Sequence, residues 1–388
     1  MNILVIGEKL FTDYALQALD DTALKVDVYY WDGTFGPELL VKPGINDYEC
    51  IVVMFDDDKL STDITAMIKR IVTNENCTVF NYILWHKAML PIMRADLIMS
   101  NPLKHSYDGI ILGISHAEVG ILADRLDGNY ANLAVSSQDI YYNYRTLEYC
   151  IDKYWEKIKD LKHIIIDMYD YEYFNYDTSL TKNIYRYFSW GGFTLDEHNM
   201  THNKIYKSSL EEVRKQLLNS KYKGIDLSKI GLWKSLFPDT YYMNGYVDYR
   251  CAYGIEKRMK IITDRLVEEY EVTSSTVLNE YLDTISENVS VMNDMLALIY
   301  SRWPDIKVDI VLLPIYKGII DKREAYYINW RQQFMEVIER LGNIYPFRFT
   351  SYLEDEMNTV KEYYYDNDHL NYFGAYVFTQ KLKQLLEK

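Results

Sequence analysis

The chain has 388 residues, of which 48% are hydrophobic and 26% are charged. These values are typical of a folded globular protein, and the length suits two or three domains or one large domain with an insertion. The net charge is −15, which disfavours contact with nucleic-acid phosphates and anionic lipid surfaces because like charges repel. We therefore expect no nucleic-acid partner.

The N-terminal segment reaches Glu8 after a short apolar run, and no later apolar run is as long as a membrane span requires. The sequence thus predicts no signal peptide, no membrane span and a cytoplasmic location. The four cysteines form no Cys-x-x-Cys pair, which favours reduced thiols over disulfides or a structural zinc. They are Cys50, Cys77, Cys150 and Cys251.

Residues 1–90 alternate between apolar runs and amphipathic stretches, which predicts a small Rossmann-like or receiver-like α/β domain with an accessory role. Gly7 follows the first strand without a G-x-G-x-x-G pattern, so a dinucleotide site is not supported. Asp56 to Asp58 follow the third strand, where carboxylates bind Mg²⁺ or begin a solvated helix, and we favour the helix start. The predicted strands are 2–7, 25–31, 49–55 and 78–82, and the predicted helices are 10–19 and 62–72.

Residues 91–388 show a second and clearer α/β pattern after a connecting segment that contains Pro91 and Pro102. Residues from about 175 to 275 interrupt the rhythm and predict an inserted cap. The predicted strands are 109–112, 129–135, 163–168, 308–314 and 346–349, and the predicted helices are 117–126, 140–154, 277–300, 322–341 and 372–385.

Ser115 lies in a predicted tight turn between a buried strand and a helix. A serine there is exposed at the carboxyl edge of the sheet, and the backbone N–H groups that follow it point at any oxyanion bound nearby. The alternative is a helix N-cap, a common use of serine in this context. We expect the adjacent His116 to be a pocket-wall or surface residue.

A nucleophilic serine needs a base and an acid that orients the base. The loop before the last predicted helix supplies both, because Asp366 can reach one ring nitrogen of His369 while the other nitrogen faces the serine. Asp366 suits this role better than Asp368, whose side chain neighbours the histidine and tends to point the other way.

At these residues the sequence resembles the SGNH, or GDSL-type, superfamily of esterases and acyltransferases. The segment Gly113 to His116 resembles its first block, and Asp366-x-x-His369-x-Asn371-x-x-Gly374 resembles its last block. The resemblance covers residues 105–388, and it implies a three-layer flavodoxin-like domain with a parallel sheet. Within the superfamily, the sequence looks most like the branch associated with polysaccharide acylation.

The resemblance also implies further site residues. Ser137 stands where the second block has the glycine whose N–H binds the oxyanion, and Tyr169 stands near the missing asparagine donor of the third block. The Asp that usually precedes the serine is Ile114 here. Backbone N–H groups of Ser115 and Ser137 are thus the expected oxyanion donors, with Tyr169 a third candidate. We expect Asn371, Trp190 and Tyr241 to contact substrate.

The resulting hypothesis is a serine esterase or O-acyltransferase for an acylated, mainly acetylated, carbohydrate or glycan precursor, without a cofactor or metal. His198 and His202 have metal-ligand spacing, but their surroundings favour an exposed loop. A second hypothesis is an impaired SGNH-like scaffold that binds glycan or a biosynthetic partner through its cap and residues 1–90. A third, a phosphotransfer regulator, rests only on Asp56 to Asp58.

Overall fold

The computed structural model describes residues 1–16, 24–32, 44–55, 58–82, 91–100, 104–178, 232, 236 and 259–387. Contacts divide the chain into two compact units, one built mainly from residues 1–89 and the other mainly from residues 90–219 and 257–388. Each unit contains one sheet with parallel strands only. The expected α/β class is confirmed.

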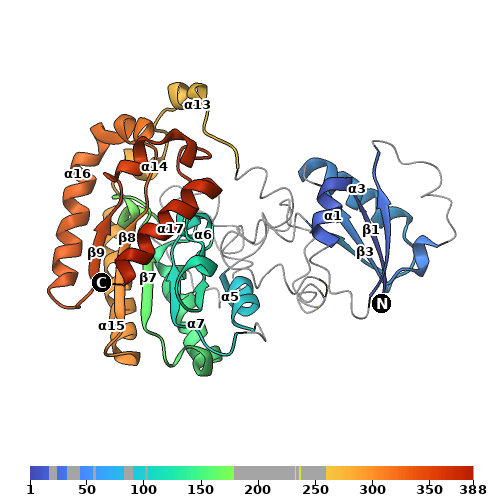
Figure 1. Cartoon of the computed structure of the whole chain (residues 1–388), viewed down its shortest axis with the longest axis horizontal. Helices are drawn as coiled ribbons and strands as arrows, with labels where there is room; N and C mark the ends of the chain where they lie inside the picture. The colour runs from blue at the N-terminus through green and yellow to red at the C-terminus, as the bar shows by residue number, and fades with distance from the viewer. Residues whose placement is uncertain are drawn as a thin grey trace. The chain divides into compact units, whose positions relative to one another are not determined.

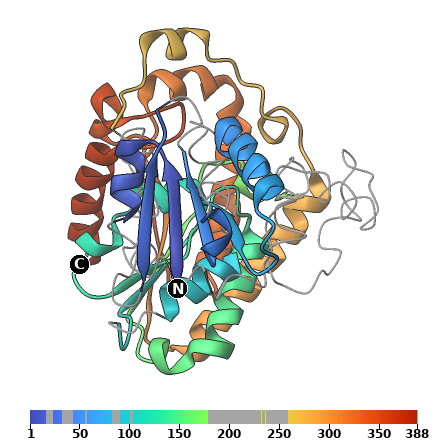
Figure 2. The same ribbon diagram turned by 90° about the vertical axis from the view of Figure 1, so that its right-hand side faces the viewer.

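The first sheet has the strand order β2-β1-β3-β4. Strand β3 is buried at every position, as expected for a central strand of a parallel sheet. Figure 2 shows these strands side by side. The elements are β1 (Asn2–Gly7), α1 (Lys9–Leu16), β2 (Lys25–Tyr30), the 3-10 helix η1 (Ile45–Asp47), β3 (Cys50–Met54), α3 (Asp58–Ile71) and β4 (Thr78–Asn81).

The second sheet has the strand order β6-β5-β7-β8-β9, which is 2-1-3-4-5 when its strands are numbered along the chain. The strands are β5 (Gly109–Leu112), β6 (Tyr130–Asn132), β7 (His163–Asp167), β8 (Lys307–Leu312) and β9 (Arg348–Ser351). Strands β5, β7 and β8 are buried at nearly every position and carry consecutive Ile, Val and Leu residues, so they form the centre of the core.

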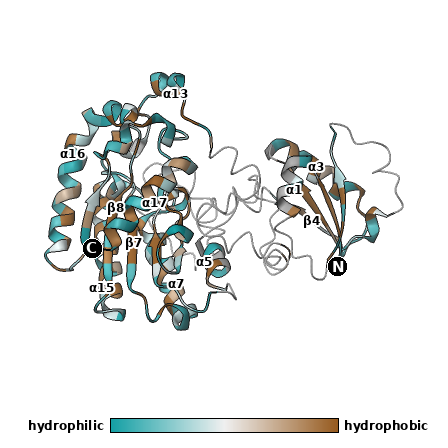
Figure 3. Cartoon of the chain, in the orientation of Figure 1, coloured by the Kyte–Doolittle hydropathy of each residue, from teal (hydrophilic) through white to brown (hydrophobic). Residues whose placement is uncertain are grey.

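Helices of this unit pack in pairs, α17 against α6 and α15 against α7 (Figure 1). Figure 3 shows strands β7 and β8 as hydrophobic, with polar residues on the helices around them. The helices are α5 (Pro91–Met99), α6 (Ser115–Gly120), α7 (Ile140–Ile158), α13 (Asp264–Glu269), α14 (Ser275–Leu278), α15 (Leu282–Arg302), α16 (Lys317–Gly342) and α17 (Tyr372–Leu386). The 3-10 helices are η2 (Ala123–Arg125), η3 (Tyr173–Asn175), η7 (Glu356–Thr359) and η8 (Lys361–Tyr363).

The prediction of a helix over 117–126 was wrong in its extent, because α6 ends at Gly120. The Asn132 side-chain amide donates to the carbonyl oxygens of Ala117 (2.9 Å) and Ile121 (3.1 Å). These bonds satisfy carbonyl groups that a further helical turn would use. Pro91–Met99 also differs from the prediction, since it forms helix α5 rather than a connecting segment.

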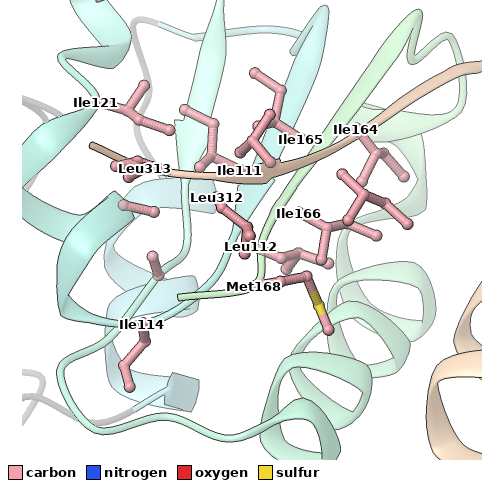
Figure 4. Close-up of a cluster of buried hydrophobic side chains, with 14 of the residues drawn as sticks. Ile111, Leu112, Ile114, Ile121, Ile164, Ile165, Ile166, Met168, Leu312 and Leu313 are labelled. Carbon is pink, nitrogen blue, oxygen red and sulfur yellow. The ribbon is translucent and has the colours of Figure 1, made fainter. Parts of the chain in front are cut away.

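The core of the second unit supports the turn that carries Ser115. Figure 4 shows side chains of β5, β7 and β8 packed together, with Ile114, the residue before Ser115, and Met168 at the border of this cluster. Since the strands are parallel, the segments after β5, β6 and β7 all leave the same edge of the sheet. That edge therefore collects Ser115, Ser137 and Tyr169.

Among the described residues, no helix combines the length and the apolar character that a membrane crossing needs. Cys50, Cys77 and Cys150 are free thiols. Asp56, Asp57, Cys251 and most of the predicted cap, residues 179–231, 233–235 and 237–258, lie outside the described residues.

Candidate active site

The turn between β5 and α6 depends on Gly113. Its φ is +152°, and a Cβ at this position would lie 2.6 Å from the Cβ of Asp167. The Gly113 N–H donates to the Asn143 side-chain oxygen at 2.7 Å. A larger residue would clash here, so glycine allows the chain to turn sharply and begin α6 at Ser115.

Asp167 lies fully buried under the same turn. Its carboxylate accepts hydrogen bonds from the backbone N–H of Ala117 (3.0 Å) and of Tyr169 (2.9 Å). Burial raises the pKa of Asp167 to about 7. The hydrogen bonds from backbone N–H groups act in the opposite direction, but burial is the larger effect. Asp167 thus joins the segment after β7 to the first turn of α6.

Ser115, His369 and Asp366 form a continuous hydrogen-bonded chain. Ser115 Oγ lies 2.8 Å from His369 Nε2, and His369 Nδ1 lies 2.8 Å and 3.0 Å from the two carboxylate oxygens of Asp366. The structure therefore brings the three predicted catalytic side chains together, although they come from distant parts of the sequence.

Asp366 also holds the backbone of its own loop. Its Oδ1 accepts from the N–H groups of Asp368 (2.9 Å) and His369 (2.8 Å). Burial alone would raise the pKa of Asp366, but the facing His369 and these hydrogen bonds lower it to about 2. Asp366 is therefore ionised near neutral pH, as an acid that orients an imidazole must be.

His116 lies in the interior and not at the surface. Its exposed fraction is 4%, and its ring stacks on the His369 ring with centroids 4.8 Å apart. The Tyr169 ring lies tilted against it, with centroids 4.5 Å apart. Burial lowers the pKa of His116 to about 3, so the ring is neutral near pH 7. Neither ring nitrogen has a hydrogen-bond partner among the described residues. The ring acts as a packing surface for His369.

The segment after β6 places Ser137 in a conformation that glycine usually adopts. Its φ is +64°, in the left-handed region. This agrees with the expectation that Ser137 replaces a glycine of the second block. The Tyr176 hydroxyl donates to the Ser137 carbonyl at 3.0 Å and helps to fix the turn.

Glu118 anchors the same segment to α6. Its carboxylate accepts from the Ser136 hydroxyl and lies 3.4 Å from Nη1 of Arg94, and Arg94 Nε donates to the Asn132 carbonyl at 2.9 Å. Sequence reasoning missed Glu118 and Arg94. The Ser-x-x-Glu spacing from Ser115 to Glu118 was a usable signal, because it is that of a capping box, although here the Glu118 side chain bonds Ser136.

Tyr169 also has a positive φ, +58°. Its N–H already donates to Asp167, so this backbone group is used. Burial raises the pKa of the Tyr169 hydroxyl well above its ordinary value, so the hydroxyl keeps its proton. The side chain, and not the backbone, is what Tyr169 can offer to a ligand.

Asn371 has a structural role, contrary to the expected substrate contact. It is fully buried, and its side-chain oxygen accepts from Gly374 N–H at 3.0 Å, which caps α17. Its amide nitrogen donates to the carbonyls of Glu362 (2.6 Å) and Lys260 (3.2 Å). No atom of the side chain remains for a substrate, so this assignment is corrected.

Four other residues singled out from the sequence, Trp190, Tyr241, His198 and His202, lie outside the described residues. Within the described part of the chain, no group of three or more His, Cys, Asp or Glu side chains is arranged to hold a metal ion.

Known proteins resemble this chain only weakly. No family model matches the chain, and no curated protein matches it either. Among solved structures, one similar chain comes from Streptococcus pneumonia and is provisionally named a platelet activating factor. The identity is 11%, the TM-score is 0.37, and the match covers 78% of this chain and 94% of the other. A TM-score this low supports no argument about this chain.

Proposed function

We propose that residues 91–388 form a serine-dependent esterase or O-acyltransferase of the SGNH type. The observation that carries this proposal is the hydrogen-bonded chain Ser115–His369–Asp366. The strand order 2-1-3-4-5 supports it, because this is the order of flavodoxin-like doubly wound sheets, whose ligands bind outside the carboxyl ends of the strands.

In the proposed reaction, Ser115 Oγ attacks the acyl carbonyl carbon while His369 Nε2 takes the hydroxyl proton. Asp366 stabilises the imidazolium through Nδ1. Backbone N–H groups of Ser115 and Ser137 stabilise the oxyanion, with the Tyr169 hydroxyl as a third candidate. His369 then returns the proton to the leaving alcohol, which departs and leaves Ser115 acylated. Attack by water on this ester gives hydrolysis, and attack by a sugar hydroxyl gives acyl transfer.

The proposed substrate is an acylated carbohydrate or glycan precursor, with acetyl as the favoured acyl group. This part of the proposal rests on the resemblance to the polysaccharide-acylation branch. To hydrolyse an acetyl ester, the site needs a small pocket for the acyl group and N–H or O–H donors for the oxyanion.

The test is hydrolysis of p-nitrophenyl acetate and of an acetylated saccharide by the wild type and by Ser115→Ala and His369→Ala. We expect each substitution to lower kcat/KM by about 10³-fold or more. A wild type no faster than Ser115→Ala would favour the alternative, a scaffold that binds glycan without turnover. Glycan binding by the Ser115→Ala variant would then be the next measurement.

A further inference from the structure

Arg323 on α16 is a buried cation whose guanidinium has a partner at each nitrogen. Nη1 lies 3.1 Å from the Asp170 carboxylate, Nε donates to the Tyr270 hydroxyl at 2.8 Å, and Nη2 pairs with Asp368. Only 5% of the Arg323 side chain is exposed. Because all three nitrogens are engaged, the planar group has one fixed orientation.

Carboxyl groups face Arg323 from two segments, Asp170 after β7 and Asp368 in the loop before α17. Burial raises the pKa of Asp170 and raises that of Glu172 well above its ordinary value, and the Tyr327 hydroxyl donates to Asp170. Burial would also raise the pKa of Asp368, but the facing Arg323 guanidinium keeps it below its ordinary value. Asp368 is therefore ionised near neutral pH and pairs with Arg323 as a carboxylate.

Asp368 lies inside the loop that holds the proposed base. It directly precedes His369 and lies two residues after Asp366, and the N–H groups of residues 368 and 369 both donate to Asp366 Oδ1. A fixed Asp368 side chain therefore fixes the turn that sets the distance from Asp366 to the His369 ring. The other end of the guanidinium fixes Asp170, which follows Tyr169 in the segment after β7.

We infer that Arg323 is a positioning residue, which ties the Asp366–His369 loop through Asp368 to the segment after β7 and so holds His369 in line with Ser115. The inference deepens the proposed function and rests on it for its catalytic consequence. Its structural part, the ordering of the loop by Arg323, is measurable without turnover.

The experiment compares Arg323→Met, Arg323→Lys and Asp368→Ala with the wild type of the full chain. Asp368→Ala breaks only the contact to the loop and leaves Arg323 paired with Asp170 and Tyr270, so it decides the question if Arg323→Met fails to fold. Arg348→Met is the matched control, because it removes the partner of the buried Asp309 at the opposite edge of the same sheet.

Two readouts are used, hydrogen–deuterium exchange of the peptide covering residues 364–371 and kinetics with p-nitrophenyl acetate. We expect Asp368→Ala and Arg323→Met to speed exchange in this peptide about tenfold or more. We expect kcat to fall about 10- to 100-fold with KM within about twofold, because a misplaced base slows chemistry and not binding. Arg323→Lys should recover part of kcat, and Arg348→Met should change neither readout.

Unchanged exchange in both Asp368→Ala and Arg323→Met would overturn the inference. Faster exchange together with unchanged kcat in an active enzyme would also overturn it. Such a result would show that Arg323 orders the loop but that this order has no effect on the base. If the wild type has no ester activity but exchange rises in the variants, Arg323 orders the loop and the proposed function is what fails.

Discussion

Each of the two parallel sheets carries a serine near the start of the helix that follows a central strand, but the two serines have different partners. Ser61 on α3 is buried and donates to the side-chain oxygen of Asn81 at the end of β4. Ser115 on α6 faces the imidazole of His369. An amide oxygen accepts a hydrogen bond but does not take the proton, whereas a neutral imidazole does.

The difference lies in what reaches each sheet edge from elsewhere in the chain. At the second sheet, the loop before α17 brings the proposed base and its orienting acid. The buried Asp167 bonds the turn of α6, and Arg323 pairs with Asp368 in the loop. A parallel sheet therefore supplies a place for a site, and in our proposal the distant loop makes the serine at that place reactive.

The sharpest way to test this comparison is to truncate both serines. Ser115→Ala should remove about 10³-fold or more of kcat/KM toward p-nitrophenyl acetate and change thermal stability little. Ser61→Ala should leave kcat/KM unchanged and destabilise the protein by about 1 kcal/mol, because the buried hydrogen bond from Ser61 to Asn81 is lost. Loss of activity in Ser61→Ala in a folded protein would break the comparison.

The orienting acid should matter almost as much. Asp366→Asn is expected to lower kcat about 10²- to 10⁴-fold, because an amide stabilises the imidazolium poorly and favours the wrong tautomer. The lowered pKa of Asp366, about 2, means that its contribution to stability is present above its unfolded value near 4 and is lost as pH falls toward 2. Acid unfolding of Asp366→Asn should therefore show a shallower pH dependence between about 4 and 2.

Asp167 should produce a pH effect of opposite sign. Its folded-state pKa is raised from 3.8 to about 7, so the folded protein binds this proton more tightly than the unfolded chain does. Asp167 should therefore favour folding most at low pH, and this contribution should decrease as pH rises from about 4 to 7, by up to a few kcal/mol. Melting of Asp167→Asn across this range should lack that slope, whereas an unchanged slope would remove Asp167 as its source.

The smallest effect is expected at His116, where the neutral ring serves as a packing surface. His116→Phe keeps an aromatic face against His369 and removes two buried nitrogens that have no partner among the described residues. We expect kcat within about threefold of the wild type and stability equal or higher by about 1 kcal/mol. His116→Ala, as the matched control, should lower kcat further because the ring contact is lost. A Phe variant as impaired as the Ala variant would show that the nitrogens matter.

The central strands could be predicted from the sequence because each of β5, β7 and β8 contains a short run of consecutive Ile, Val or Leu residues. Ser115, Asp366 and His369 could be nominated from the turn and the loop motif. The end of α6 could not, since it depends on the Asn132 amide, which comes from another strand.

The buried residues that hold the site in place could not be predicted from the sequence. Arg323 lies 45 residues before Asp368, and no spacing or motif connects them. Asn371 was assigned to substrate because of the block it belongs to, although the pattern Asn-x-x-Gly at the start of a helix is also that of an N-cap. Motifs thus identify reacting atoms more readily than the buried groups that hold them.

The most direct test of the central claim is to label the protein with an alkyl fluorophosphonate, which reacts with an activated serine, and to locate the adduct by mass spectrometry. The account predicts one adduct, on the peptide that contains Ser115, and its loss in His369→Ala. Absence of an adduct in the folded wild type, or an adduct at Ser61, Ser136 or Ser137 instead, would contradict the assignment of Ser115 as the nucleophile.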